Sequence, residues 1–155
     1  MAIERIYKIP LLDVAVNAAA DLFIIEATSG MAFTLHEIKL SQRSQTNVMF
    51  AKIGFQRLSG AYEIGSGGTS VTPQPLHGGG AAATVTGLVN NTVRNTGGTQ
   101  IIFDADDYNY VNGFFYQPAE DDRPLFSPST AFVLTIDSVP ANAVMSGSVT
   151  IGELY

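Results

Sequence analysis

Hydrophobic and polar residues alternate along most of this chain, and no window shows the 3.6-residue period of an amphipathic helix. The pattern predicts a lead-in strand and eight further strands, separated by turns rich in Gly, Pro and Asn. The predicted strands are Ile3–Ile9, Asp21–Thr28, Phe33–Ser41, Val48–Leu58, Thr84–Asn90, Thr99–Asp104, Tyr110–Gln117, Ala131–Asp137 and Val144–Leu154.

Two places in this pattern are irregular. In the strand that begins at Phe33, Phe33 and Leu35 fall on one face, whereas Ile38 and Leu40 fall on the other. This change of phase predicts a β-bulge near His36-Glu37. The alanine-rich stretch Asp13–Leu22 is compatible either with a short helix or with an irregular strand.

Eight antiparallel strands with connections of uneven length favour an all-β, two-sheet jelly roll, with an immunoglobulin-type sandwich as the alternative. A chain of 155 residues is expected to form a single domain over residues 1–155. Within that domain we expect an N-terminal arm over residues 1–19 and a Gly/Pro-rich interaction loop over residues 59–83.

The glycine-rich stretch over residues 59–87 contains eight of the fifteen glycines and only one charged residue, Glu63. Such a composition is typical of a flexible linker. Apolar residues such as Tyr62, Ile64, Val71 and Leu76 are interleaved with the glycines, however, and a free linker has no use for them. The stretch is therefore predicted to be an ordered loop that lies against a partner protein.

Charge separates this chain from several functional classes. Charged residues make up only 14% of the chain, against about 25% in typical proteins, and the net charge of −6 argues against nucleic-acid binding. Six of the eight basic residues precede residue 58, while six acids lie within residues 104–122, a distribution that suits docking between copies or with a neighbouring protein.

The absence of cysteine excludes disulfides and thiolate metal sites. With neither a signal-like segment nor a long apolar run, synthesis in the cytoplasm and no membrane contact are expected.

Three short motifs resemble catalytic or binding signatures without their required context. His77–Gly80 matches an esterase oxyanion motif, but no Gly-x-Ser-x-Gly elbow accompanies it. Gly65–Ser70 lacks the lysine of a phosphate loop, and Asp104–Asp107 lacks the later ligands of an EF-hand. An irregular cation site formed by the acids of residues 104–122 stays open as the alternative to a solvated acidic loop or an interface patch. With His36 and His77 as the sole imidazoles, we expect no enzyme activity, no cofactor and no metal.

Aromatic residues are dense around the acidic segment, and two interpretations remain open for them. Tyrosines beside carboxylates can line a sugar-binding groove, whereas the simpler interpretation places the rings in the core. The residues concerned are Tyr108, Tyr110, Phe114, Phe115, Tyr116 and Phe126.

Several segments taken together resemble a family of small proteins from the structural modules of tailed phages. The segments are Ala20–Glu26, Leu35–Gln42, Phe55–Arg57, Gly65–Leu76, Gly113–Arg123 and Gly152–Leu154. The resemblance implies a virion protein, most similar to capsid decoration (cement) proteins, with a jelly-roll fold and a trimeric state. The major capsid protein and other copies of the chain would then be its partners, on the capsid surface. The alternative is a tail-tip module that binds a receptor or glycan.

Residues expected to contact such partners combine the basic N-terminal segment, the glycine-rich loop and the acidic cluster. They are Ile3, Arg5, Ile6, Lys8, Gly65, Gly67, Gly68, Val71, Pro73, Pro75, Leu76, Asp106 and Asp107.

Overall fold

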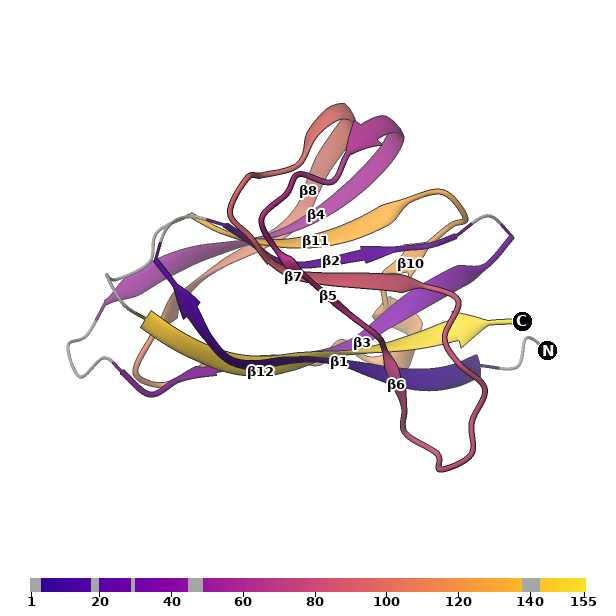
Figure 1. Cartoon of the computed structure of the whole chain (residues 1–155), viewed down its shortest axis with the longest axis horizontal. Helices are drawn as coiled ribbons and strands as arrows, with labels where there is room; N and C mark the ends of the chain where they lie inside the picture. Colours follow the sequence, from indigo (N-terminus) through magenta and orange to yellow (C-terminus); the bar gives the residue numbers. More distant parts are fainter. Residues whose placement is uncertain (1–3, 18–19, 29, 45–48, 138–142) are drawn as a thin grey trace.

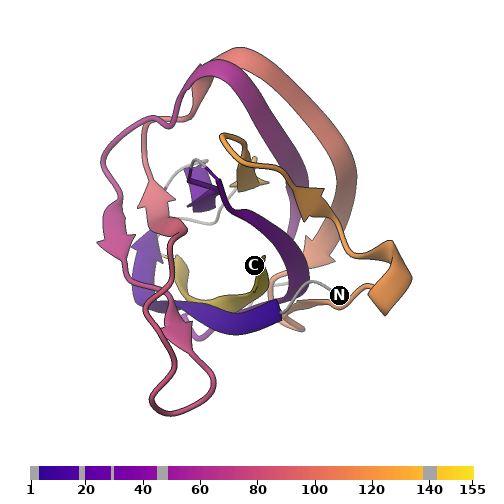
Figure 2. The same ribbon diagram turned by 90° about the vertical axis from the view of Figure 1, so that its right-hand side faces the viewer.

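The structure, a computed structural model, describes residues 4–17, 20–28, 30–44, 49–137 and 143–155. Two antiparallel sheets, sheet A and sheet B, face each other across one core (Figure 1), and Figure 2 shows them from the end of the sandwich. Within the described residues the single helical turn is a 3-10 helix, Glu120–Asp122. The predicted all-β, two-sheet antiparallel architecture is confirmed.

Each sheet contains six strands of very different lengths. Sheet A is formed by β1 (Glu4–Val16), β3 (Ala32–Gln42), β6 (Gln74–Pro75), β9 (Phe114–Tyr116), β10 (Leu125–Phe126) and β12 (Ala143–Leu154). Sheet B is formed by β2 (Ala20–Glu26), β4 (Phe50–Glu63), β5 (Thr69–Val71), β7 (Thr86–Asn91), β8 (Thr96–Asn109) and β11 (Ala131–Ile136).

The strand pairing follows the jelly-roll order. If β5, β6, β7 and β10 are set aside, eight strands remain, and they pair from the ends of the chain inward. Thus β1 pairs with β12, β2 with β11, β3 with β9 and β4 with β8. This nesting of early with late strands is what a double Greek key produces, so the architecture is consistent with a jelly roll. The short strands β5, β6 and β7 form an insertion between β4 and β8.

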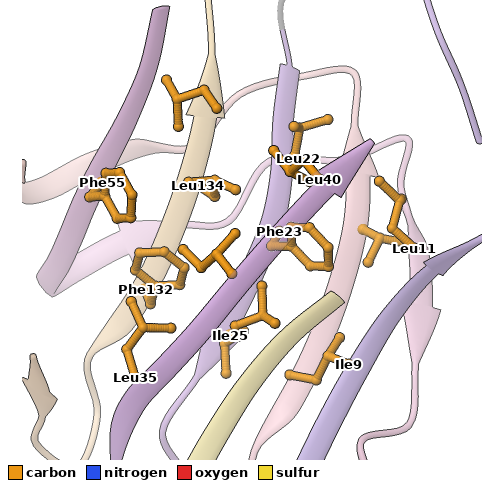
Figure 3. Packing of buried hydrophobic residues seen from close by; sticks show 14 of the residues in the cluster. Ile9, Leu11, Leu22, Phe23, Ile25, Leu35, Leu40, Phe55, Phe132 and Leu134 are labelled. Atoms are coloured by element: carbon orange, nitrogen blue, oxygen red, sulfur yellow. The ribbon is translucent and has the colours of Figure 1, made fainter. Parts of the chain in front are cut away.

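Apolar side chains from both sheets fill the space between them. Figure 3 shows Phe55, Phe132 and Leu134 of sheet B and Leu35 and Leu40 of sheet A within one cluster between the sheets, and all five side chains are buried. Burial of one such side chain stabilises the fold by about 1.5–3 kcal/mol. The alternation seen in the sequence therefore identifies the inner faces of the sheets.

The bulge predicted near His36-Glu37 is confirmed by the register between β3 and β12. Thr150 lies opposite Glu37 and Ile151 lies opposite Leu35, so that His36 is the extra residue on β3. Because the bulge restores the phase, the apolar residues before and after it, including Ile38, all point into the same core.

The alanine-rich stretch Asp13–Leu22 adopts the strand alternative over the residues that the structure describes. β1 extends to Val16, and β2 begins at Ala20. The strand is irregular at Asp13, which has a φ of 48° and lies within a register shift between Leu11 and Val14.

The N-terminal segment differs from the arm that the sequence suggested for residues 1–19. Residues 4–16 are an integral strand of sheet A, paired along their length with β12. The physical reason is that Tyr7, Ile9 and Leu11 alternate into the core and are almost fully buried. An arm that left the sandwich would expose all three side chains.

Candidate functional site

The glycine-rich residues 59–87, hereafter the crossover segment, pass from sheet B to sheet A and close one edge of the sandwich. In this segment β5 pairs with β7 of sheet B, whereas β6 pairs with β1 of sheet A. Figure 2 shows the segment running down one side of the sandwich and ending in a projecting loop. The predicted interaction loop is thus ordered, but much of it lies against its own domain.

Three of the glycines expected to contact a partner instead allow the crossover segment to approach its own chain. Gly65 and Gly67 have positive φ angles of 77° and 85°. A side chain at Gly65 would overlap the Val93 carbonyl, and one at Gly68 would overlap the carbonyl of Val89 or the side chain of Asn91. These positions require glycine for internal packing.

The other predicted residues of the segment divide between the core and the surface. Pro73 is buried, Val71 packs against the core, and Pro75 pairs with Tyr7 in sheet A. Leu76 is different, because 53% of its surface is exposed. Beyond it, the His77–Gly80 motif forms an exposed turn in which the Gly80 N–H donates to the His77 carbonyl at 3.0 Å.

The predicted N-terminal contacts are brought beside the crossover segment, with the exception of Ile3, which lies outside the described residues. The Ile6 carbonyl accepts a hydrogen bond from the Leu76 N–H at 3.1 Å. The Arg5 guanidinium lies 4.2 Å from the centre of the Tyr155 ring, and Lys8 Nζ lies 3.6 Å from a carboxylate oxygen of Glu37. These groups therefore have partners within the domain.

A buried carboxylate anchors the returning half of the crossover segment. Glu153 on β12 is fully buried, and its Oε1 accepts hydrogen bonds from the N–H groups of Thr84 and Val85 at 2.7 and 2.8 Å. Its Oε2 accepts one from the Tyr155 hydroxyl at 2.6 Å. Burial, followed by this hydrogen bond, raises the pKa of Tyr155. The Tyr7 hydroxyl adds a hydrogen bond to the Ala81 carbonyl at 3.1 Å.

A second polar cluster joins the beginning of β1 to β3. Glu4 Oε1 lies 2.7 Å from His36 Nε2 and also accepts a hydrogen bond from the Thr34 hydroxyl, while Arg123 lies 4.0 Å from Oε2. Burial raises the pKa of the Glu4 carboxyl, but these hydrogen bonds and positive charges outweigh it and lower the pKa overall. His36 is thus positioned at the bulge to contact Glu4.

The opposite edge of sheet B is open. In the described structure, β8 pairs with β4 on one side and with no strand on the other. Most of β8 is exposed, including Ile102 at 61%, Asp106 and Asp107. The predicted acidic residues Asp106 and Asp107 are therefore far along the sheet order from the crossover segment, and they do not form one site with it.

The aromatic residues around the acidic segment belong mainly to the core, as the simpler of the two interpretations expected. Tyr108 and Tyr110 are almost fully buried, with their ring centres 5.0 Å apart. The Tyr116 ring lies 4.8 Å from that of Phe55. Phe115, in contrast, is more than half exposed and borders, together with Phe114, a surface depression that no tyrosine lines.

Sequence reasoning missed a cluster of polar side chains on the outer face of sheet B. Asp21 on β2, Gln56 on β4 and Thr135 on β11 are buried there, together with Asn95 from the connection between β7 and β8. Asp21 Oδ2 accepts hydrogen bonds from the backbone and side-chain N–H groups of Asn95 at 2.8 and 2.9 Å. The available signal was weak: Lys52 and Gln56 fall on one face of β4, but such a pair is also typical of a solvated face, and Asp21 and Thr135 are isolated polar residues in largely apolar strands.

The described residues were also considered as metal ligands and as a membrane span, and the whole chain was compared with known proteins. Across the described ranges, no three His, Cys, Asp or Glu side chains converge on a point that would hold a metal ion. The same residues include no helix of the length and apolarity needed to cross a membrane. No family model, curated protein or solved structure matches the chain.

Proposed function

We propose that this protein is a structural virion component that decorates a phage capsid. In this role it acts as a homotrimer on the capsid surface and stabilises the capsid by clamping neighbouring major capsid subunits. The proposal rests on the resemblance described above and on one structural observation. The open edge strand β8 combines the exposed apolar residue Ile102 with the acidic residues Asp106 and Asp107.

An open edge of this kind favours binding to another protein over self-pairing. The outward N–H and C=O groups of β8, which pair with no strand in the described part of the chain, are available to an added strand from a neighbour. The carboxylates of Asp106 and Asp107 discourage pairing with β8 of another copy and favour a basic partner instead. The closed opposite edge and the continuous core provide the rigid scaffold that a clamp requires.

Imaging of the native particle tests this function directly. We expect hundreds of copies per particle at junctions between capsid subunits, with β8 against the capsid. A handful of copies at one vertex or at the tail would instead support a tail-tip module. Light scattering of the purified protein should give three times the mass of the 16.5 kDa chain, and a strict monomer in solution and on the particle would contradict the trimer.

A further inference from the structure

The connection between β8 and β9 contains the chain's single Asn-Gly pair, Asn112-Gly113. Asparagine is a thermolabile side chain. When glycine follows it, the backbone nitrogen of the glycine can attack the side-chain carbonyl carbon and close a five-membered ring. Glycine favours this attack, because it has no Cβ to block the approach and its backbone adopts many angles. The Asn112-Gly113 pair thus has the sequence that spontaneous deamidation requires.

The structure leaves both reacting groups of this pair accessible. Asn112 is exposed, and its side-chain amide makes no hydrogen bond to any residue that the structure describes. The Gly113 N–H likewise donates to no acceptor in the described part of the chain. The turn is held instead by the backbone of Asn112, whose N–H donates to the Asn109 carbonyl at 3.1 Å. This hydrogen bond involves neither the side-chain amide nor the attacking nitrogen.

Other asparagines provide a comparison within the same chain. Residues 49–137 are described without a gap, and the four further asparagines in this range all have hydrogen-bonded side chains. They are Asn90, Asn91, Asn95 and Asn109. Asn109 is the nearest of them, and its Oδ1 accepts a hydrogen bond from the Val111 N–H at 3.0 Å. It also precedes Tyr110, whose side chain hinders attack by the backbone nitrogen.

Water reaches the turn from a surface depression of about 440 Å³, which Asn112 and Gly113 help to line. The reaction needs this water twice, first to take a proton from the Gly113 nitrogen and later to open the ring. Lys39 lines the same depression. A carboxylate formed at position 112 would therefore lie on one surface with the Lys39 ammonium group, which favours the charged product.

We propose that Asn112 deamidates spontaneously in the folded protein. The Gly113 nitrogen gives its proton to hydroxide or water and attacks Asn112 Cγ. A bond between that nitrogen and Cγ forms, the bond between Cγ and Nδ2 breaks, and Nδ2 takes up a proton and leaves as ammonia. Water then adds to one of the two ring carbonyl carbons, which gives aspartate or isoaspartate at position 112. No electrons are transferred, and the inference does not rest on the virion role.

The isoaspartate product also changes the path of the main chain. In this product the backbone runs through the former side chain and gains a methylene group directly before β9. A Cβ at Gly113 would lie 2.8 Å from the Leu40 carbonyl oxygen, so the turn has little room for an additional atom on this side. Because Phe114 pairs with Leu40, the short pairing between β9 and β3 lies next to the modified residue. Deamidation thus alters both the charge and the shape of the depression.

Incubation of the full-length protein in mildly alkaline buffer tests the proposal. Cleavage after Arg94 and Glu120 releases residues 95–120, in which Asn95 and Asn109 accompany Asn112 as internal controls. Mass spectrometry locates the gain in mass that results when a hydroxyl replaces an amide group. We expect Asn112 to be converted at least about tenfold faster than either control. Equal rates at the three asparagines would overturn the proposal.

A parallel incubation in urea separates reaction of the folded protein from reaction of the unfolded chain. The folded protein should convert Asn112 at a rate within about tenfold of the unfolded chain, because the turn offers little protection. A folded rate below that limit would show that the fold protects Asn112, and it would overturn the proposal. Both rates should fall in mildly acidic buffer, since the Gly113 nitrogen must lose a proton before it attacks.

A matched pair of variants assigns the acidic form that anion exchange separates from the starting protein. Asn112→Gln should slow its formation at least about tenfold, because glutamine would have to close a less favourable six-membered ring. Asn17→Gln alters another exposed asparagine, which precedes alanine, and should leave the rate unchanged. An isoaspartate methyltransferase should label the aged wild type and the Asn17→Gln protein but not the Asn112→Gln protein. Formation of the acidic form at the wild-type rate in Asn112→Gln would contradict the assignment.

Discussion

The edge strands of a sheet present N–H and C=O groups without a partner strand, and the two edges of this sandwich treat these groups in opposite ways. At one edge the crossover segment joins the sheets and is fixed by the buried carboxylate of Glu153. At the other edge no described strand pairs with the outer side of β8, and Asp106 and Asp107 lie on its surface. An edge closed by buried hydrogen bonds contributes to stability, whereas an edge protected by charge remains available for contact. The closed edge therefore contributes to stability, whereas under the proposed function the open edge makes the contact with a neighbour.

The largest effect is expected at the closed edge. Glu153→Ala leaves the N–H groups of Thr84 and Val85 without their acceptor and removes one of the partners of the Tyr155 hydroxyl. Loss of several buried hydrogen bonds to a charged group should reduce the free energy of unfolding by about 3 kcal/mol or more. Urea unfolding followed by circular dichroism measures this change.

The control for that variant is Glu63→Ala, since Glu63 is an exposed glutamate near the end of β4. It should change the free energy of unfolding by no more than about 0.5 kcal/mol. Equal effects of the two substitutions would mean that the buried carboxylate of Glu153 does not fix the closed edge more firmly than an exposed carboxylate of the crossover segment does.

A smaller effect on the fold, but a clear one on binding, is expected at the open edge. The double change Asp106→Asn and Asp107→Asn removes two exposed charges, so the free energy of unfolding should shift by at most about 0.5 kcal/mol. Occupancy on the particle should fall at low salt and approach that of the wild type at high salt, because exposed charges are screened. Occupancy that is unchanged at every salt concentration would argue against β8 as the contact edge. Addition of a chelator should alter neither quantity.

Much of the fold could be predicted from the sequence because its strands obey a simple alternation. The bulge at His36 was predictable, since the two apolar pairs on either side of it must both reach the core. The short strands β5, β6 and β10 were not, because two or three residues show no period. Their pairing depends on which edges happen to lie nearby.

The candidate site was predicted less well than the fold, for two physical reasons. The glycines at 65, 67 and 68 indicated close approach correctly, but composition alone does not reveal whether the nearby surface is a partner or the same chain. The polar cluster on the outer face of sheet B joins Asp21, Gln56 and Asn95, which are far apart in sequence. Only the three-dimensional structure brings their side chains together.

A moderate, pH-dependent effect is expected where Glu4 joins β1 to β3. Its pKa lies below the ordinary value of 4.5 in the folded protein, so ionised Glu4 stabilises the fold above that value. This stabilisation is lost as the pH falls through the lower, folded pKa. Glu4→Gln should therefore destabilise the protein by about 1 kcal/mol near neutral pH, as expected for a partly exposed charged hydrogen bond.

The measurement for Glu4 is the free energy of unfolding as a function of pH. The difference between the wild type and Glu4→Gln should narrow below pH 4.5, while the exposed Glu63→Gln control shows no such trend. A difference that stays constant through this range would mean that the Glu4 charge contributes nothing.

The smallest effect concerns Tyr62, which lies in β4 where the crossover segment begins and packs against the outer cluster of Ile24, Leu58 and Val133. Burial raises the pKa of Tyr62 to about 12, with further contributions from the charge of Glu26 and from the hydrogen bond that the Tyr62 hydroxyl donates to it at 3.2 Å. Since the folded pKa exceeds the unfolded value of 10, the neutral phenol stabilises the fold below pH 10, and this stabilisation is lost as the pH rises through about 12.

The difference in ultraviolet absorbance between the wild type and Tyr62→Phe isolates the Tyr62 phenol from the other tyrosines. Glu26→Gln should lower its pKa but leave it above 10, because burial is the larger cause. A Tyr62 phenol that ionises at pH 10 or below while circular dichroism still reports the folded state would show that this edge is open to water.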